Sequence, residues 1–281
     1  TIIACSANPD EVIEIVYNNI NKETSSLPKD LIARIFINRT DYVDHIYNAI
    51  NDSIQRLILI GGFQGIGKSS LLKSILYLTQ KDVAIFWYEC SKITNVDDIL
   101  LSLASYLEKK VWKNPFELKS RSLISIDERL VSYLSRLNKP LLVVLDNFEF
   151  LVDNNNNLVD PDLKNFFNYL LSNQSLNLIL SGQKLPTNDI DSMDDSVVEF
   201  RIGGIEESDA KDFLKSLGIT AQDSVLESIH ESSRGYPWVL NLVGVALQIL
   251  DMTPEKLLEE IKEQKIPLEN CIIEKLLDKE D

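Results

Sequence analysis

Short apolar runs alternate with helical patterns along the first two thirds of the chain. Continuous runs rich in β-branched and aromatic residues predict buried strands at residues 57–60, 83–88, 141–145, 176–180 and 197–202. Apolar residues recur at helical spacing over residues 69–79, 96–110, 123–137 and 162–171. This alternation predicts an α/β domain, with a parallel sheet and helices on both of its faces.

The pattern changes after Gly204. From Ser208 onward only helical patterns follow, at about 208–217, 222–233, 238–250, 254–263 and 270–278. Ser208 and Thr253 are expected at helix starts, and Pro254 suits a first turn. Two more helices are expected ahead of the sheet, at 9–20 and 41–50. We therefore expect an N-terminal linker and helix (1–35), an α/β domain (36–204), a small all-helical domain (205–265), and a tail or start of a winged-helix domain (266–281).

One motif at the end of the first predicted strand carries specific chemistry. The sequence from Gly62 to Ser69 fits G-x-x-x-x-G-K-[ST], the phosphate-binding P-loop. Glycines let successive backbone N–H groups turn toward phosphate oxygens, and the following helix directs its positive dipole end at the anion. The expected binding residues are Gly62, Phe63, Gln64, Gly65, Ile66, Gly67, Lys68, Ser69 and Ser70. Lys68 is expected to reach the β- and γ-phosphates, and the Ser69 hydroxyl to bind Mg²⁺.

A second motif supplies the expected carboxylates. The apolar run 141–145 ends in Asp146, which is expected at the Mg²⁺ beside the P-loop. Many P-loop ATPases carry Glu directly after this Asp, but here that position is Asn147. Glu149 is therefore the hypothesis for the residue that orients the attacking water. Lys68, Asp146 and Glu149 form the predicted catalytic set, and Ser69 with Asp146 the predicted metal ligands.

The amino-acid composition limits the binding partners and the cellular setting that we expect. The formal net charge of −15 argues against direct binding of nucleic acid, which needs a cationic surface to displace counterions. The apolar window 238–250 is too short to span a bilayer, so no membrane role is expected. Three widely separated cysteines show no metal-ligand spacing, which favours a reducing, cytoplasmic setting.

These motifs together resemble STAND-class signalling NTPases, in particular the NB-ARC-like branch. Phe36 and Arg39 lie in a segment similar to the family's entry motif, which borders the adenine. The segment 178–183 is similar to the sensor strand, with Gln183 in place of the usual arginine. The run from Gly235 to Pro237 is similar to the family's G-x-P motif, whose proline packs on the adenine ring. The resemblance covers about residues 34–265.

The resemblance implies an ASCE/AAA+-like P-loop NTPase fold and a switch driven by ATP/ADP with Mg²⁺. ADP would hold a closed state, and ATP would favour an open one that self-associates and signals, in defence or transcriptional control, with slow ATP hydrolysis. Two alternatives remain open: an AAA+-like ATPase acting on DNA or protein, and a non-hydrolysing module with structural ADP. The helical tail argues against a small-molecule kinase. Effector, sensor and signal are not identified by the sequence, and the chain is consistent with a fragment.

Overall fold

The computed structural model describes residues 39–52, 54–79, 83–111, 133–172, 176–190, 196–264 and 267–278. The expected helix at 9–20, the adenine candidate Phe36 and most of the expected helix at 123–137 lie outside these ranges. The other expected elements fall within them.

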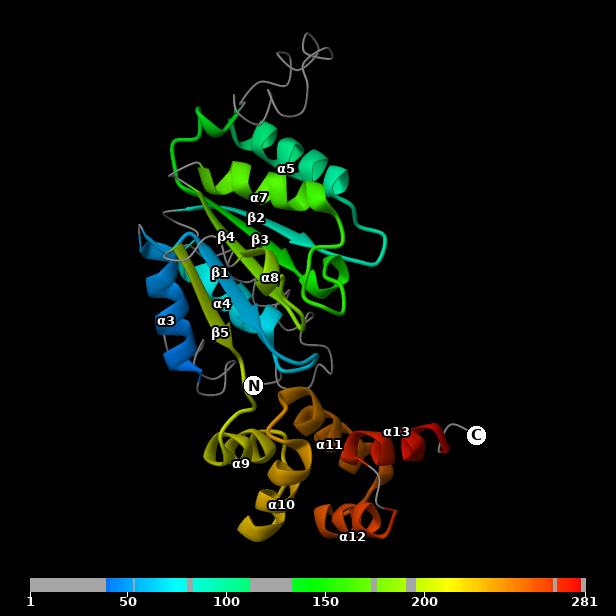
Figure 1. The fold of residues 1–281 in the computed structure, drawn as a ribbon. Helices are drawn as coiled ribbons and strands as arrows, with labels where there is room; N and C mark the ends of the chain where they lie inside the picture. Colours follow the sequence, from blue (N-terminus) through cyan, green and yellow to red (C-terminus); the bar gives the residue numbers. More distant parts are fainter. Residues whose placement is uncertain are drawn as a thin grey trace. The chain divides into compact units, whose positions relative to one another are not determined.

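The described part of the chain contains one parallel sheet (Figure 1). Its strands are β1 (Leu57–Gly61), β2 (Ala84–Glu89), β3 (Leu141–Asp146), β4 (Leu176–Gly182) and β5 (Val197–Arg201). They lie in the order β2-β3-β4-β1-β5, and every neighbouring pair is parallel. Because β1, β4 and β3 are parallel neighbours, their carboxyl ends lie side by side at one edge of the sheet.

Helices cover both faces of the sheet (Figure 1). One face packs with α5 (Val96–Val111) and α7 (Pro161–Ser172) into the main hydrophobic core. The other face carries α3 (Thr40–Asn51) and α4 (Lys68–Thr79). Asn177 donates a hydrogen bond to the Ile50 carbonyl of α3 at 2.7 Å, and Lys73 of α4 lies 5.9 Å from the Trp87 ring centroid.

The alternation of side chains along each strand assigns the sheet's polar residues to one face. Val143 and Leu145 of β3 and Leu178 and Leu180 of β4 all belong to the core beneath α5 and α7. Asp146 and Ser181 follow those residues by one position and therefore point to the opposite face, the face covered by α3 and α4. We call this the α4 face.

Two short elements were not expected from the sequence. They are η3 (Phe148–Leu151), a 3₁₀ turn directly after β3, and α8 (Thr187–Ile190), which follows β4. Phe148 and Leu151 of η3 are buried in the core beneath α5 and α7.

The C-terminal region of the described chain is helical, as expected. It consists of α9 (Glu207–Ser216), α10 (Asp223–Ser233), α11 (Pro237–Leu250), α12 (Pro254–Gln264) and α13 (Leu268–Asp278). Its own core includes Ala210, Leu214, Leu226, Ile229, Leu240, Val243, Leu257 and Ile272. This core is separate from the one beneath α5 and α7.

The expected helix boundaries in this region need one correction. Thr253 caps α12 as expected, since its hydroxyl accepts a hydrogen bond from the Lys256 N–H at 3.4 Å. Ser208 is not a cap, because α9 already begins at Glu207 and the extended residue before it is Glu206. Ser208 therefore lies inside the first turn, among acidic residues that favour a helix N-terminus.

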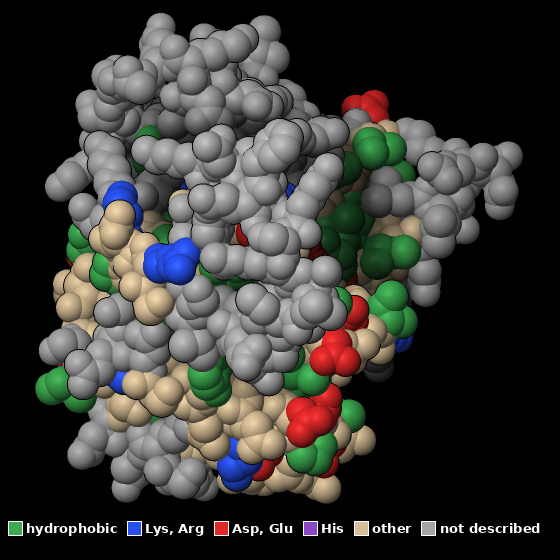
Figure 2. Space-filling model, turned by 90° about the horizontal axis from the view of Figure 1, so that it is seen from above, with side chains coloured by type: hydrophobic (Ala, Val, Ile, Leu, Met, Phe, Trp, Pro, Cys, Tyr) green, Lys and Arg blue, Asp and Glu red, His purple; other side chains and the backbone are tan. Residues whose placement is uncertain are grey.

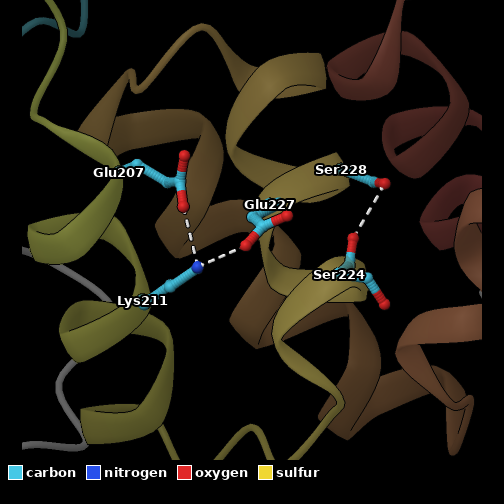
Figure 3. Close-up of polar contacts among 5 residues, drawn as sticks. All are labelled: Glu207, Lys211, Ser224, Glu227 and Ser228. Carbon is cyan, nitrogen blue, oxygen red and sulfur yellow. Dashed lines mark hydrogen bonds and ion pairs between the residues drawn. The ribbon is translucent and has the colours of Figure 1, made fainter.

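An ion-pair bridge joins α9 to α10 (Figure 3). Lys211 Nζ lies 2.7 Å from a carboxylate oxygen of Glu207, and 2.7 Å from one of Glu227. Hydrogen bonds to Glu207 and then to Glu227 raise the pKa of Lys211 above its ordinary value. Ser228 donates to the Ser224 carbonyl at 3.0 Å on the same helix as Glu227.

The chain divides into two compact units. The first combines Thr1–Asp41, Gln64–Leu71 and Gly203–Asp281, so the P-loop motif from Gln64 onward belongs with the helical region. The second contains Tyr42–Phe63 and Leu72–Ile202 and holds the sheet. Among the described helices, none combines the length and apolar character needed to cross a membrane.

Candidate nucleotide-binding site

The P-loop motif forms the turn between β1 and α4. Gly65 and Gly67 have φ angles of +76° and +94°, which only glycine adopts without strain. The helix begins at Lys68, no acidic residue lies in its first turn, and the Leu71 N–H bonds the Gly67 carbonyl at 2.9 Å. The structure thus has a helix N-terminus behind a glycine turn, the geometry that binds phosphate.

The side chains of this loop differ in exposure. Lys68 is only 7% exposed and Ile66 is buried, whereas Phe63 is 68% exposed. Ser69 and Ser70 are half-buried in the first turn of α4. Gln64 is exposed, and Gly62 is half-buried where the chain leaves β1.

Within the first unit, the helical region contacts this loop directly. The Trp238 N–H, in the first turn of α11, points at the Gly65 carbonyl at 3.4 Å, and a Cβ placed on Gly65 would lie 2.9 Å from Trp238 Cβ. Pro237 is the first residue of α11, so the adenine candidate lies next to this contact. Trp238 was not among the predicted site residues, although it directly follows Pro237.

Arg39 is buried in the same unit. Its guanidinium donates to the Gly203 carbonyl at 2.9 Å, at the point where the chain enters the helical region. A Cβ on Gly67 would lie 3.6 Å from Arg39 Nη1. Arg39 therefore lies close to the P-loop glycine and is hydrogen-bonded to the segment leading into α9.

Among the described residues of the second unit, two buried side-chain oxygen atoms lack hydrogen-bond partners. They are Oδ1 of Asp146 and Oγ of Ser181, whose residues are 2% and 0% exposed. Leu145 pairs with Leu180 in register, so Asp146 and Ser181 are neighbours across β3 and β4. An unpaired buried oxygen costs about 1–3 kcal/mol, so such a pair indicates a place for a ligand. Ser181 was not among the predicted site residues, although it follows the apolar run of β4.

Glu149 lies on the other face of this edge. Its Oε2 accepts a hydrogen bond from the Gln183 N–H at 3.1 Å. A Cβ on Gly182 would lie 2.8 Å from the same oxygen. Gly182 continues the alternation of Leu178 and Leu180, so its Cβ direction is that of the core face and opposite to Ser181. The Gln183 side chain is exposed and lies beyond the end of β4.

A second carboxylate lies on the α4 face. Glu89 is the last residue of β2 and pairs in register with Asp146, so the two side chains point the same way. Asn147 Nδ2 donates to Glu89 Oε1 at 3.0 Å. Asn147 reaches β2 because its backbone is left-handed (φ 54°, ψ 39°), a conformation that asparagine tolerates.

The carboxylates at the ends of β2 and β3 affect the pKa of the neighbouring Cys90 thiol. Burial first, and then the charges of Asp146, Glu149 and Glu89, together raise the pKa of Cys90 to about 12. Three acidic groups therefore surround the end of β2 and β3, and they oppose formation of a thiolate there.

The residues present fit Mg²⁺. A partnerless carboxylate oxygen and a half-buried serine hydroxyl are hard oxygen donors of the kind this cation prefers. The described residues contain no cluster of three or more His, Cys, Asp and Glu that could hold a metal unaided. Mg²⁺ bound by either of these donors would therefore share its coordination with water and phosphate oxygens, and would neutralise phosphate charge.

Residues 51–188 match the model of a protein family described as AAA domain. This segment contains the P-loop motif, Asp146 and the end of β4. The chain has the fold of a P-loop NTPase. A search of curated proteins found no match.

Solved structures share this fold. The Walker-type ATPase of Pyrococcus abyssi is 18% identical with a TM-score of 0.57, over 88% of this chain and 77% of that one. A STAND protein with a tetratricopeptide repeat sensor from Pyrococcus horikoshii is 13% identical with a TM-score of 0.53, over 74% of this chain and 30% of that one. The Aeropyrum pernix ORC1 protein, solved in complex with DNA, is 19% identical with a TM-score of 0.50, over 76% and 60%. This chain thus spans under a third of the STAND protein's length.

Surface charge bears on the partners of the site. On the face drawn in Figure 2, acidic side chains gather along one side of the described surface, while the basic ones are scattered. The described residues in this view form no continuous cationic strip. The net charge of the whole chain is −15.

Proposed function

We propose that the chain is an ATP/ADP-binding switch of the STAND signalling type, in which the bound nucleotide controls the helical region. Gly62 to Ser70 would cradle the phosphates, with Lys68 at the β- and γ-phosphates and Ser69 with Asp146 at Mg²⁺. Arg39 and Pro237, and Phe36 by resemblance, would border the adenine. Hydrolysis would be slow and would return the switch to its ADP state.

The contact between Trp238 and Gly65 is the observation that carries this proposal. The first turn of α11 abuts the phosphate-binding loop, so a nucleotide that alters the loop must act on the helical region. Arg39 supports the same coupling, because its partner Gly203 begins the segment that leads to α9. A switch requires that ATP and ADP differ in the free energy with which they bind its two conformations. We infer that this difference arises at the contact between the P-loop and α11.

The experiment compares the chain with ADP and with a non-hydrolysable ATP analogue, by small-angle scattering and by mass in solution. A change of shape or oligomer mass between the two supports the switch. Trp238→Ala should retain nucleotide binding but reduce that change, whereas Ile249→Ala, an exposed apolar position 48% accessible in the last turns of the same helix, should leave it intact. Identical shape and mass with both nucleotides would contradict the proposal.

A second candidate is an AAA-type ATPase acting on DNA. The observation that favours it is the likeness to the ORC1 protein that was solved with DNA. It predicts turnover stimulated by duplex DNA and binding that weakens with salt. The net charge of −15 weighs against it. A module with structural ADP, the other alternative, predicts bound ADP that does not exchange.

A further inference from the structure

We propose that Glu89, rather than Glu149, is the carboxylate that orients and deprotonates the attacking water in ATP hydrolysis, with Asn147 holding it in position. This inference rests on the proposed function, because it concerns the same nucleotide site. Its basis is the face of the sheet on which each carboxylate lies.

The α4 face holds two side-chain oxygen atoms that lack hydrogen-bond partners. Asp146 Oδ1 and Ser181 Oγ point to it from neighbouring strands, and each is buried. Alternation along β2 gives Glu89 the direction of Trp87, whose ring lies under Lys73 of α4. Glu89 is therefore a carboxylate on the same side of the sheet as α4, the helix whose N-terminus follows the P-loop.

Glu149 is directed to the opposite face. It packs where a Gly182 side chain would be, in the direction of Leu178 and Leu180, and the Gln183 N–H holds its Oε2. A carboxylate oxygen that already accepts a backbone hydrogen bond on the core face is badly placed to bind water on the α4 face. Its position is better explained by attachment of η3 to the end of β4.

Asn147 has the geometry of a positioning residue. Its left-handed backbone interrupts the direction of β3 and turns the amide toward β2, where it donates to Glu89 Oε1 at 3.0 Å. Glu89 is exposed, so the other carboxylate oxygen is accessible to water. An ionised carboxylate with one oxygen fixed and one oxygen accessible is suited to accept a water proton.

The step balances without a further reactant. The water oxygen forms a bond to the γ-phosphorus, and the bond from that phosphorus to the β–γ bridging oxygen breaks, with its electron pair leaving on ADP. One water proton passes to the Glu89 carboxylate and then to solvent. ADP and inorganic phosphate are released, and Glu89 returns to its ionised form.

The test uses the whole chain and measures nucleotide affinity and single-turnover hydrolysis separately. Glu89→Gln keeps the shape and the contact with Asn147 but removes the basic oxygen. We expect ATP affinity within about threefold of the unaltered chain and hydrolysis slower by about 10²-fold or more, the range of a lost general base. Glu149→Gln should slow hydrolysis much less. Glu255→Gln, an exposed position at the start of α12, is the control for any loss of a surface carboxylate.

A second readout does not depend on turnover. Urea unfolding of Glu89→Ala, Asn147→Ala and the double variant should show that the two substitutions are not additive, because the residues share one hydrogen bond. Additive effects, or hydrolysis that falls with Glu149→Gln and not with Glu89→Gln, would overturn the inference. A chain that binds ATP but never hydrolyses it would also overturn it. Failure to bind ATP at all would instead contradict the proposed function.

Discussion

Glu149 accepts a hydrogen bond from the backbone N–H of Gln183, with 3.1 Å between Oε2 and N. This bond ties the 3₁₀ turn after β3 to the end of β4. It links two residues from separate predicted features: Glu149 was expected at the attacking water, and Gln183 in the segment similar to the sensor strand. In the structure, the Glu149 carboxylate contacts the Gln183 backbone on the core face of the sheet. Gln183 itself is exposed.

The Gly182 position tests how closely Glu149 packs on β4. In Gly182→Ala the new Cβ would lie 2.8 Å from Glu149 Oε2 and 2.9 Å from its backbone nitrogen, so the 3₁₀ turn must shift. We expect the free energy of unfolding to fall by about 1–3 kcal/mol, as for other overpacked sites. Gly203→Ala is the matched control, since nothing lies within 4 Å of its Cβ. Equal midpoints in urea for both variants would contradict the packing described here.

Ser181→Ala separates a ligand-binding role from a structural one. The hydroxyl is buried without a partner, so its removal should leave stability unchanged or raise it by about 1 kcal/mol. If the hydroxyl serves the nucleotide, ATP turnover should nevertheless fall by at least about tenfold. Urea unfolding and single-turnover assays on the same variant provide both numbers. A destabilised variant with normal turnover would show that Ser181 has only a packing role.

Asp146→Asn should distinguish metal binding from phosphate binding. Loss of the carboxylate charge removes the proposed Mg²⁺ ligand but leaves the P-loop backbone intact. We expect ADP to bind in the presence of a chelator about as well as to the unaltered chain, while the Mg²⁺-dependent gain in ATP affinity is lost. Titrations with and without Mg²⁺ measure this difference. An undiminished Mg²⁺ effect would place the metal elsewhere.

Cys90 should react very slowly with alkylating reagents in the folded chain. Its pKa is raised from about 9 to about 12, so the thiolate fraction at pH 8 is on the order of one in ten thousand. Peptide mass spectrometry after iodoacetamide treatment, native and in urea, measures the protection. Because the folded pKa is the higher one, the thiol's contribution to stability is complete below about pH 9 and is lost as the pH rises toward 12. Rapid labelling at pH 8 would contradict this environment.

The sequence predicted the strands well because each is a nearly continuous apolar run. The expected and observed limits of β1, β3 and β5 differ by one residue at most. β4 continues to Gly182, two residues past the expected end. Ser181 and Gly182 extend the hydrogen-bonded ladder, but they do not belong to the apolar run from which the end was predicted. The four-residue elements η3 and α8 are too short to show a period.

The candidate site was less predictable than the fold. The P-loop could be found because its chemistry is local in sequence. The face of Glu149 could not, since the left-handed Asn147 ends the two-residue alternation at Asp146. Glu89 falls one residue beyond the expected end of its strand, which the structure extends to Glu89. Ser181 became a candidate only when its neighbour across the sheet and its missing partner were known. The expected domain limits and the roles of all the predicted site residues, Phe36, Gln183 and Pro237 among them, stay predictions.

Nucleotide titration of the purified chain tests the central claim most directly. The account predicts that both ATP and ADP bind, and that Lys68→Ala weakens binding by about 100-fold, or ~2.7 kcal/mol. Lys92→Ala, an exposed lysine after β2, should bind as the unaltered chain does. If neither nucleotide is retained, or if Lys68→Ala binds both as tightly as before, the account is contradicted.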